Sequence, residues 1–393
     1  MMSAPLLADA ELVPPLDEFG LPGPVWLFRA LLLVTFAAHV VFMNFALGAG
    51  VLIPAIWRLG RRGDRPEAIE LALCLTGAWP IAVSFTITSG VAVLLFTQVL
   101  YGHVFYTANI LMGWRWLALV AYLVVGFYAV YGLKRALHRQ HVAVGMALCV
   151  LALACFLSAA HAFNNNAILS LRPGLWRDIA TGQRHPYASD PMWVPRYLHT
   201  IIGSLAVSGL WMVALGRGSR SLGDAARRLA GSAGLRVTLW ATVAQVLSGA
   251  WLLAALDGAT RASLFSFTEP RGIAWFLAAA AGIVTIGVLL RAVERPQEPR
   301  SFWLPAGLIA AVLLGMSAGR EQIRVETLSK LGRALYEPTD VRMQTGPLVA
   351  FLAVLIAGAV VIVVMLRWLR SAPARSPAGG STLPDGPPHD ETR

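Results

Sequence analysis

Apolar residues fill long stretches of this chain, and shorter stretches between them hold most of the charged residues. A helix rises about 1.5 Å per residue, so roughly twenty apolar residues are needed to cross about 30 Å of hydrocarbon. By that criterion the sequence predicts about nine membrane-spanning helices, at residues 30–57, 70–100, 111–133, 142–165, 195–215, 237–256, 272–290, 302–318 and 347–366. The eighth is short and contains Pro305. The pattern therefore predicts an all-α polytopic membrane protein.

Composition supports this class of protein. Of the 393 residues, 57% are hydrophobic and 13% are charged, and the mean hydropathy is +0.63, which is outside the range of soluble domains. A formal net charge of +11 would suggest a nucleic-acid partner for a soluble protein. Here the basic residues fall between apolar runs, where membrane orientation explains them better, so we expect the lipid bilayer and no nucleic acid as a partner.

Alternate loops differ in their content of Lys and Arg. The loops at 58–65, 134–139, 217–236 and 291–300, and the segment after 366, are rich in both residues, whereas the other loops are poorer for their length. Cytoplasmic loops retain positive charge, so the N-terminus is predicted to lie outside and the C-terminus inside a bacterial cytoplasmic (inner) membrane. An odd number of crossings fits this orientation.

The two ends of the chain differ from the apolar middle. Residues 1–26 are predicted to form an extracytoplasmic segment without a cleavable signal peptide, because acidic residues and no basic region precede the first apolar run. Residues 369–393 are rich in Pro, Gly, Ser and Asp and are predicted to form a disordered cytoplasmic tail. Residues 27–368 are left as the transmembrane domain.

The chemistry available within the predicted spans comes from histidine. His39, His161 and His199 lie within spans, and an unpaired imidazole in hydrocarbon is costly and needs a partner. His161 and His199 are predicted at similar depth on consecutive antiparallel helices, and His39 lies deeper. Two neutral imidazoles so placed can ligate one metal from opposite faces, as in bis-histidine b-type haem. The alternative is that each ring hydrogen-bonds to a neighbouring helix.

Small residues and arginines accompany these histidines. The small residues are Gly48, Gly50, Ser89, Gly90, Gly203 and Ser204. They would let a flat macrocycle approach the backbone, and they suit tight helix packing equally well. Arg196 and Arg320 lie at the predicted outer rim, where a guanidinium can pair with haem propionates or meet lipid headgroups. The cysteines Cys74, Cys149 and Cys155 show neither CxxC nor CxxCH spacing, so neither c-type haem attachment nor a disulfide framework is indicated.

Carboxylates are nearly absent from the predicted spans, and none lies clearly in a span interior. Proton-coupled transporters and ion pumps use such groups, so their absence argues against that class. It also removes the obvious proton relay for oxygen reduction.

The segments around the histidines resemble motifs of subunit I of cytochrome bd-type ubiquinol oxidases. HVVFMNFALG, which begins at His39, is similar to the first-helix motif whose histidine ligates the oxygen-reactive haem. VPRYLHTIIGSLAVSG, around His199, resembles the fifth-helix motif whose histidine ligates the low-spin haem b. LSAAHAFNNNAIL resembles the end of the fourth helix and places Asn166 on the family's asparagine, while Gly319-Arg320 with Gln322 resembles a degraded Gly-Arg-Gln motif. The resemblance covers about residues 27–366.

The resemblance implies a haem-binding subunit of a respiratory complex that transfers electrons to oxygen. It implies one or more haem b groups, or haem d, with His39 as the catalytic axial ligand and His199 as the second ligand. His161, Asn166, Arg196 and Arg320 would complete the haem-binding residues. The implied partners are an integral subunit II-like chain and a quinol or cytochrome c as electron donor.

The chain also departs from the family pattern. The seventh predicted helix has no methionine at its start, the eighth has no glutamate, and a run containing Trp114, Arg115 and Trp116 replaces the paired glutamates of the third. The family's quinol-binding loop is reduced to about residues 257–271. His161 could replace the missing methionine beside His199. Two alternatives therefore stay open: a haem-containing electron-transfer or anchor subunit that reduces no oxygen, and a haem-free small-molecule transporter.

Overall fold

The structure is a computed structural model that describes residues 12–186, 190–332 and 334–371. Contacts divide the chain into two units, Met1–Arg342 and Met343–Arg393, which are described separately. The described residues form helices and no named strands, and their one pairing of extended backbone is an isolated bridge between Leu21 and Val341. The predicted all-α fold is confirmed.

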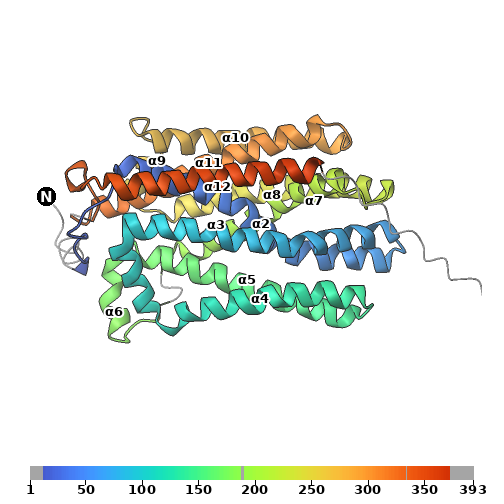
Figure 1. Ribbon diagram of the computed structural model, residues 1–393, viewed down its shortest axis with the longest axis horizontal. Helices are drawn as coiled ribbons and strands as arrows, with labels where there is room; N and C mark the ends of the chain where they lie inside the picture. Colours follow the sequence, from blue (N-terminus) through green and yellow to red (C-terminus); the bar gives the residue numbers. More distant parts are fainter. Residues whose placement is uncertain (1–11, 187–189, 333, 372–393) are drawn as a thin grey trace, which may run out of the picture. The chain divides into compact units, whose positions relative to one another are not determined.

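Eight long helices make up most of the first unit (Figure 1). They are α2 (Val25–Arg62), α3 (Pro66–Met112), α4 (Trp114–His138), α5 (Val142–Leu169), α7 (Trp193–Gly218), α8 (Asp224–Ala254), α10 (Pro270–Glu294) and α11 (Arg300–Ser329). Within the described part of the chain, these eight are long and apolar enough to cross a membrane. The predicted polytopic membrane bundle is thereby confirmed. Short elements lie in the connections: η1 (Pro173–Leu175), α6 (Trp176–Ala180), α9 (Gly258–Leu264) and η2 (Pro338–Asp340).

The predicted ninth span forms α12 (Thr345–Ser371) in the second unit. Its apolar portion Thr345–Gly358 is shorter than the other candidate spans. A ninth crossing therefore stays a prediction. Residues 1–11 and 372–393, which hold parts of the predicted N-terminal segment and tail, lie outside the described residues.

Consecutive long helices pack as antiparallel pairs, most extensively α2 with α3, α4 with α5, α7 with α8, and α10 with α11. Small residues allow this close approach, because a Cβ on Gly209 of α7 would overlap the backbone of Gly234 on α8. The α2–α3 and α7–α8 pairs meet where the Ser208 hydroxyl of α7 donates to the Asn44 carbonyl oxygen of α2 at 3.0 Å. This contact ties the two histidine-bearing helices together.

Several helices are longer than the sequence predicts, α3 and α11 by the most. α3 continues past a kink at Tyr101, where φ is −136° and ψ is 24°, to Met112. α11 continues past the predicted end at 318 to Ser329, so the prediction of an outer loop beginning at 319 is wrong. Hydropathy falls there while the helix continues, because the buried residues of this last part include Glu321 and Arg324. These polar residues pack against other helices and not against lipid.

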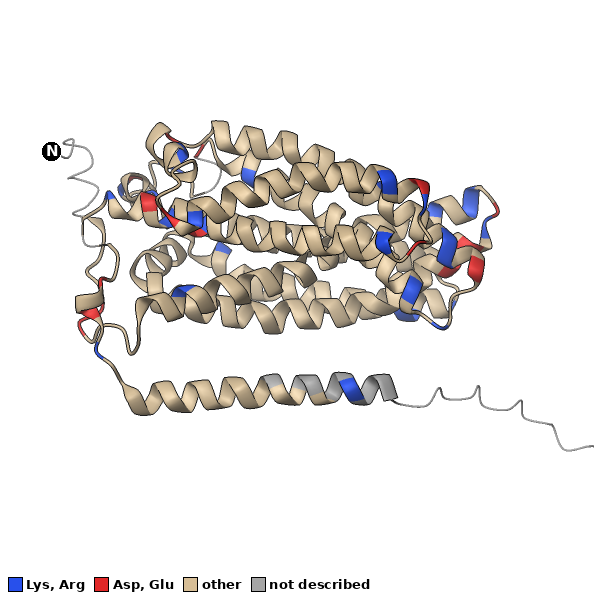
Figure 2. Ribbon diagram, turned by 90° about the horizontal axis from the view of Figure 1, so that it is seen from above, with Lys and Arg blue, Asp and Glu red and all other residues tan. Residues whose placement is uncertain are grey.

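Charged residues gather at the two ends of the first unit, and the helix middles between them are almost free of charge (Figure 2). One end holds the C-terminus of α2 with Arg61 and Arg62, and the α4–α5 turn with Arg135 and Arg139. The other end holds Arg196 and the last turns of α11. The candidate site lies toward this second end.

Candidate functional site

His39 lies on α2 against α3. Its Nδ1 is 3.0 Å from the carbonyl oxygen of Thr86 and 3.3 Å from Oγ of Ser89. A carbonyl oxygen only accepts hydrogen bonds, and Ser89 donates its own proton to the Phe85 carbonyl at 2.6 Å. Nδ1 of His39 therefore carries the ring proton. This leaves Nε2 with the lone pair that a metal ligand needs.

His199 on α7 is held in the same way by α8. Its Nδ1 is 3.0 Å from Oγ of Ser248. The Ser248 hydroxyl also lies 3.1 Å from the Gln245 backbone carbonyl and 3.3 Å from Gln245 Oε1, so it can either accept from Nδ1 of His199 or donate to it. With Ser248 as the acceptor, Nε2 of His199 keeps the lone pair that a metal ligand needs. At His39 the Thr86 carbonyl fixes this tautomer.

Each imidazole also packs on the glycine that follows its serine partner. A Cβ on Gly90 would come within 3.0 Å of Cε1 of His39, and a Cβ on Gly249 within 3.2 Å of Cε1 of His199. The α2–α3 and α7–α8 pairs thus share one arrangement, in which a histidine of the first helix meets a Ser-Gly step of the second. Sequence reasoning singled out Ser89 and Gly90 but missed Ser248 and Gly249, although the recurring Ser-Gly pair was a readable signal.

The two histidines lie toward the same end of the unit. Asn44 of α2 and Ser208 of α7 form the contact between the two helices. His39 lies five residues before Asn44, and His199 lies nine residues before Ser208. At 1.5 Å per residue, His39 is about 8 Å and His199 about 14 Å from this contact along the helix axis. His39 is therefore the deeper of the two, as the sequence predicts. Both rings are partly exposed, which leaves their Nε2 atoms room for a partner.

His161 on α5 has different neighbours. Its ring centroid lies 4.9 Å from that of Trp193 and 5.9 Å from that of Tyr197, both in edge-to-face geometry. Tyr197 and His199 are two residues apart on α7, which is about 200° around the helix. His161 thus contacts one flank of α7 while His199 contacts α8 from another. The structure does not bring these two imidazoles together, and a ligand role for His161 stays a prediction.

Asn166 joins α5 to α3. Its Nδ2 donates to Oδ1 of Asn109 at 2.5 Å, and it is 4% exposed. The adjacent Asn165 donates to the Pro186 carbonyl at 2.6 Å, and Asn164 to the Trp193 carbonyl at 3.2 Å. These amides fasten the end of α5 to its surroundings. Haem binding by Asn166 also stays a prediction.

Arg196 and Arg320 belong to a larger group, here called the arginine cluster: Arg29 of α2, Arg196 of α7, and Arg320 and Arg324 of α11. Arg320 lies close enough to Arg196 and Arg324 for their charges to interact, and its charge also acts on His39. Its guanidinium lies 4.2 Å over the ring of Phe36. The cluster therefore adjoins the His39 imidazole, and Arg196 is one helical turn before His199.

One carboxylate sits within the cluster. Oε2 of Glu321 lies 3.1 Å from Nη1 of Arg324, and both side chains are less than a tenth exposed. Tyr101 donates its hydroxyl proton to the other oxygen of Glu321, and the Arg324 guanidinium lies 4.6 Å over the Tyr101 ring. The nearby Asp190 pairs with Arg172 at 2.6 Å, and its charge also acts on Arg196. Among the described residues, Glu321 is the one carboxylate that forms an ion pair with an arginine of the cluster.

This imbalance makes the cluster suitable for anions. Nε of Arg29 is buried and has no hydrogen-bond partner among the residues that the structure describes. Desolvated like charges repel one another, and a buried cation is costly without a partner. Guanidinium groups bind carboxylates through two parallel charge-assisted hydrogen bonds. The pair of propionates on a haem has the chemistry that this cluster requires.

Glu321 corrects the expectation that no span interior holds a carboxylate. It is 5% exposed and lies within α11, which is long and apolar enough to cross a membrane. Sequence reasoning placed it in a loop because hydropathy alone ended the helix at 318. The argument against proton-coupled transport that rested on missing carboxylates is correspondingly removed.

His103 on α3 is a further imidazole near this end that sequence reasoning did not assign to the site. Its Nε2 is buried without a partner in the described part of the chain. An orphaned ring nitrogen of this kind can accept a hydrogen bond from a ligand or from water.

No family model matches this chain, and no curated protein sequence matches it. Among solved structures, the bd oxidase from Geobacillus thermodenitrificans is similar, with a TM-score of 0.60 and 15% sequence identity over 89% of this chain and 99% of that chain. The chain has a bd-oxidase-like fold. At this identity the likeness concerns the fold and assigns no role to a residue or to a subunit. The resemblance read from the motifs is thus confirmed for the fold alone.

Proposed function

We propose that this bd-oxidase-like protein is a haem b-binding membrane subunit of a respiratory electron-transfer complex, with His39 and His199 as axial ligands. The supporting observation is the repeated arrangement of these two imidazoles, each held at Nδ1 by a neighbouring helix next to a Ser-Gly step, which leaves Nε2 as the nitrogen for a metal. Bound haem would supply one-electron redox chemistry.

The surrounding residues fit such a group. Arg196 and Arg320 would bind propionates, because the arginine cluster holds more positive charge than Glu321 balances. Ser89 and Ser248 would orient the ligating rings from α3 and α8. Gly90 and Gly249 leave the space in which those rings lie.

The experiment is to purify the full chain in mild detergent from cells supplied with haem, and to record the reduced-minus-oxidised spectrum with extraction of the pigment. We expect a b-type spectrum, and lower haem stoichiometry in His39→Ala and His199→Ala. His141→Ala removes an exposed histidine at the start of α5 and serves as the matched control. No Soret absorbance in the unmodified protein would exclude every haem-based function and favour the transporter.

Oxygen reduction is the narrower proposal, and a non-oxidase electron-transfer or anchor subunit is its competitor. The competitor is favoured by the absence of a methionine at the start of the seventh predicted span. The absence of a glutamate from the eighth no longer supports it, because α11 holds Glu321. A carbon monoxide difference spectrum on the reduced protein separates the two. A protein with an open iron position at His39 should show a clear change, and a fully ligated low-spin protein should show little.

We also propose the inner membrane of a bacterium as the location, with the His39 and His199 end facing outward. The basic ends of α2, α4 and α7 support this orientation because cytoplasmic loops retain positive charge. An integral membrane partner and a quinol or cytochrome c donor remain part of the proposal.

A further inference from the structure

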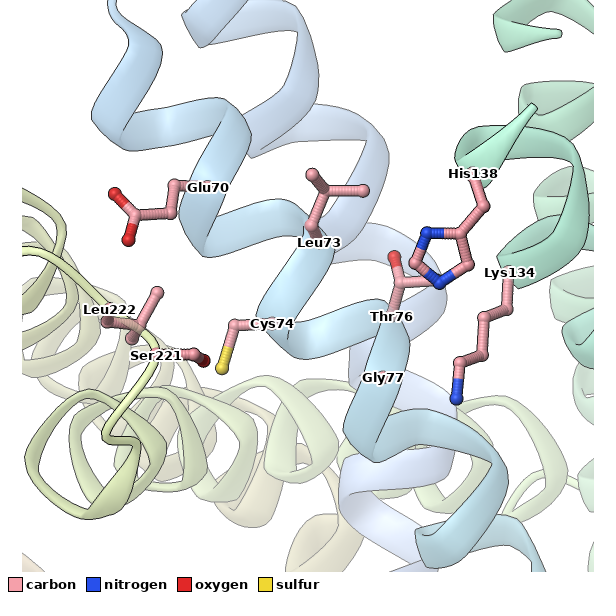
Figure 3. A pocket seen from close by; sticks show the side chains of 9 residues that line it. All are labelled: Glu70, Leu73, Cys74, Thr76, Gly77, Lys134, His138, Ser221 and Leu222. Atoms are coloured by element: carbon pink, nitrogen blue, oxygen red, sulfur yellow. The ribbon is translucent and has the colours of Figure 1, made fainter. Parts of the chain in front are cut away.

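A cavity of about 350 Å³ lies in the first unit, at the end remote from His39 and His199. Figure 3 shows the side chains that line it. It is enclosed by the first turns of α3, the last turns of α4 and the connection between α7 and α8. Cys74 on its α3 wall is twelve residues from Thr86, or about 18 Å along the helix. The cavity is therefore separate from the proposed haem site, and its size is that of a small-ligand pocket.

Two basic side chains form one wall of the cavity. Lys134 and His138 are one helical turn apart on α4, and both extend toward α3 (Figure 3). Neither has a hydrogen-bond or ion-pair partner among the described residues. Lysine offers three donors and histidine one or two, so this wall presents unused donors and positive charge.

The one carboxylate of the cavity is engaged elsewhere. Glu70 lies on the side of α3 that faces the α7–α8 connection (Figure 3), and its Oε1 accepts the backbone N–H of Gly223 at 2.6 Å. Gly223 immediately precedes the first residue of α8, so Glu70 satisfies a donor at the start of that helix. Glu70 therefore forms no ion pair with Lys134, and the donors of the α4 wall stay available for another anion.

The remaining lining is apolar and open. Leu73 is 38% exposed, and a Cβ on Gly77 would meet no atom within 4 Å. Leu222 closes the cavity on the side of the α7–α8 connection and is 4% exposed. A hydrocarbon chain can therefore lie along α3 next to the basic wall.

We propose that this cavity binds an anionic phospholipid, with the phosphate at Lys134 and His138 and an acyl chain over Leu73 and Gly77. Positive charge at headgroup depth beside an apolar groove complements the two halves of such a lipid. Basic pockets between transmembrane helices are known sites for anionic headgroups. This assignment depends neither on haem nor on electron transfer.

Native mass spectrometry of the delipidated full chain tests the proposal. Phosphatidylglycerol should bind more tightly than phosphatidylcholine, and the double substitution Lys134→Gln with His138→Gln should weaken phosphatidylglycerol binding by about fivefold or more. Arg135→Gln removes a charge from the same helical turn but does not line the cavity, and should leave binding unchanged.

Three results would overturn the proposal. The first is equal binding of phosphatidylglycerol and phosphatidylcholine. The second is that Arg135→Gln weakens phosphatidylglycerol binding as much as the double substitution does. The third is displacement of phosphatidylglycerol by millimolar inorganic phosphate, which would identify a site for the free anion. The substituted side chains are exposed, so an unchanged thermal unfolding midpoint is expected and shows that the variants are folded.

Discussion

Four residues on α3 and α8 hold the imidazoles of His39 and His199 in place. Ser89 and Ser248 contact the Nδ1 side of each ring, and Gly90 and Gly249 leave space for it. An intramembrane hydrogen bond contributes only about 0.6–2 kcal/mol to helix association. Its larger effect is to select the tautomer, because a ring fixed with its proton on Nδ1 presents Nε2 to a metal.

Ser248→Ala tests this positioning role. The substitution leaves Nδ1 of His199 without its hydrogen-bond partner, and loss of such an outer partner typically lowers metal affinity about 10–100-fold. We expect apo-protein titrated with haem to bind more weakly, with a shifted spectrum of the ligated iron. Ser158→Ala is the matched control, since Ser158 bonds only within α5, to the Ala154 carbonyl. Equal haem affinity in both variants would contradict the role.

Gly90→Ala tests the packing of His39. The added Cβ would lie 3.0 Å from Cε1 of the ring, so the imidazole must shift by a few tenths of an ångström. We expect lower haem content by extraction and spectrum. Gly282→Ala on α10, where a Cβ meets nothing within 4 Å, should bind haem normally and even gain up to about 1 kcal/mol in stability. Normal haem content in Gly90→Ala would show that the contact is dispensable.

At the scale of elements, the last turns of α11 carry the polar interior of the bundle. Glu321, Arg324 and Tyr101 join α11 to the kinked part of α3, and Arg320 reaches toward α2. A buried ion pair is weak support for a fold, but removing one partner strands the other charge. This helix end is therefore sensitive to single charge changes.

Glu321→Gln measures that sensitivity. It removes the partner of the buried Arg324 guanidinium, and we expect a loss of about 3–5 kcal/mol in the free energy of unfolding. The double variant Glu321→Gln with Arg324→Gln should recover part of this loss. Glu326→Gln breaks a more exposed contact with Lys330 on the same helix and should cost less than about 1 kcal/mol. Equal thermal shifts for the two single variants would argue against an uncompensated cluster.

At the scale of the molecule, the first unit has two chemically different ends. The histidines and the arginine cluster lie toward one end, and the basic loops with the phospholipid cavity lie at the other. In a respiratory subunit this separation would place redox groups near one membrane surface and lipid anchoring at the opposite surface.

Labelling with a membrane-impermeant maleimide in intact cells tests the orientation. We expect Thr181→Cys, after α6, to be labelled from outside and Gln140→Cys, in the α4–α5 turn, to be protected; both positions are exposed. The unsubstituted protein gives the background, since Cys149 and Cys155 are buried and Cys74 is partly buried. The reverse labelling pattern would overturn the proposed topology.

The sequence by itself determined the class of the fold and the candidate ligands. Span length and apolarity are properties of consecutive residues, so eight of the nine predicted spans appear as long helices at the expected places. His39 and His199 were identified because a polar ring is conspicuous in an apolar run. The same local reasoning ended α11 too early, since hydropathy cannot distinguish a solvated polar residue from Glu321, which is buried against other helices.

Only the tertiary structure decided which residues surround those ligands. Ser248 is 49 residues from His199, and Glu321 is 220 residues from Tyr101, so no window along the chain joins them. The arginine cluster draws on three helices, and its excess charge exists only once they pack. The proton on each histidine likewise depends on a hydrogen-bond partner from a neighbouring helix. Tautomer, charge balance and ligand geometry are therefore properties of the packed bundle, because each arises from groups that folding brings within hydrogen-bonding distance.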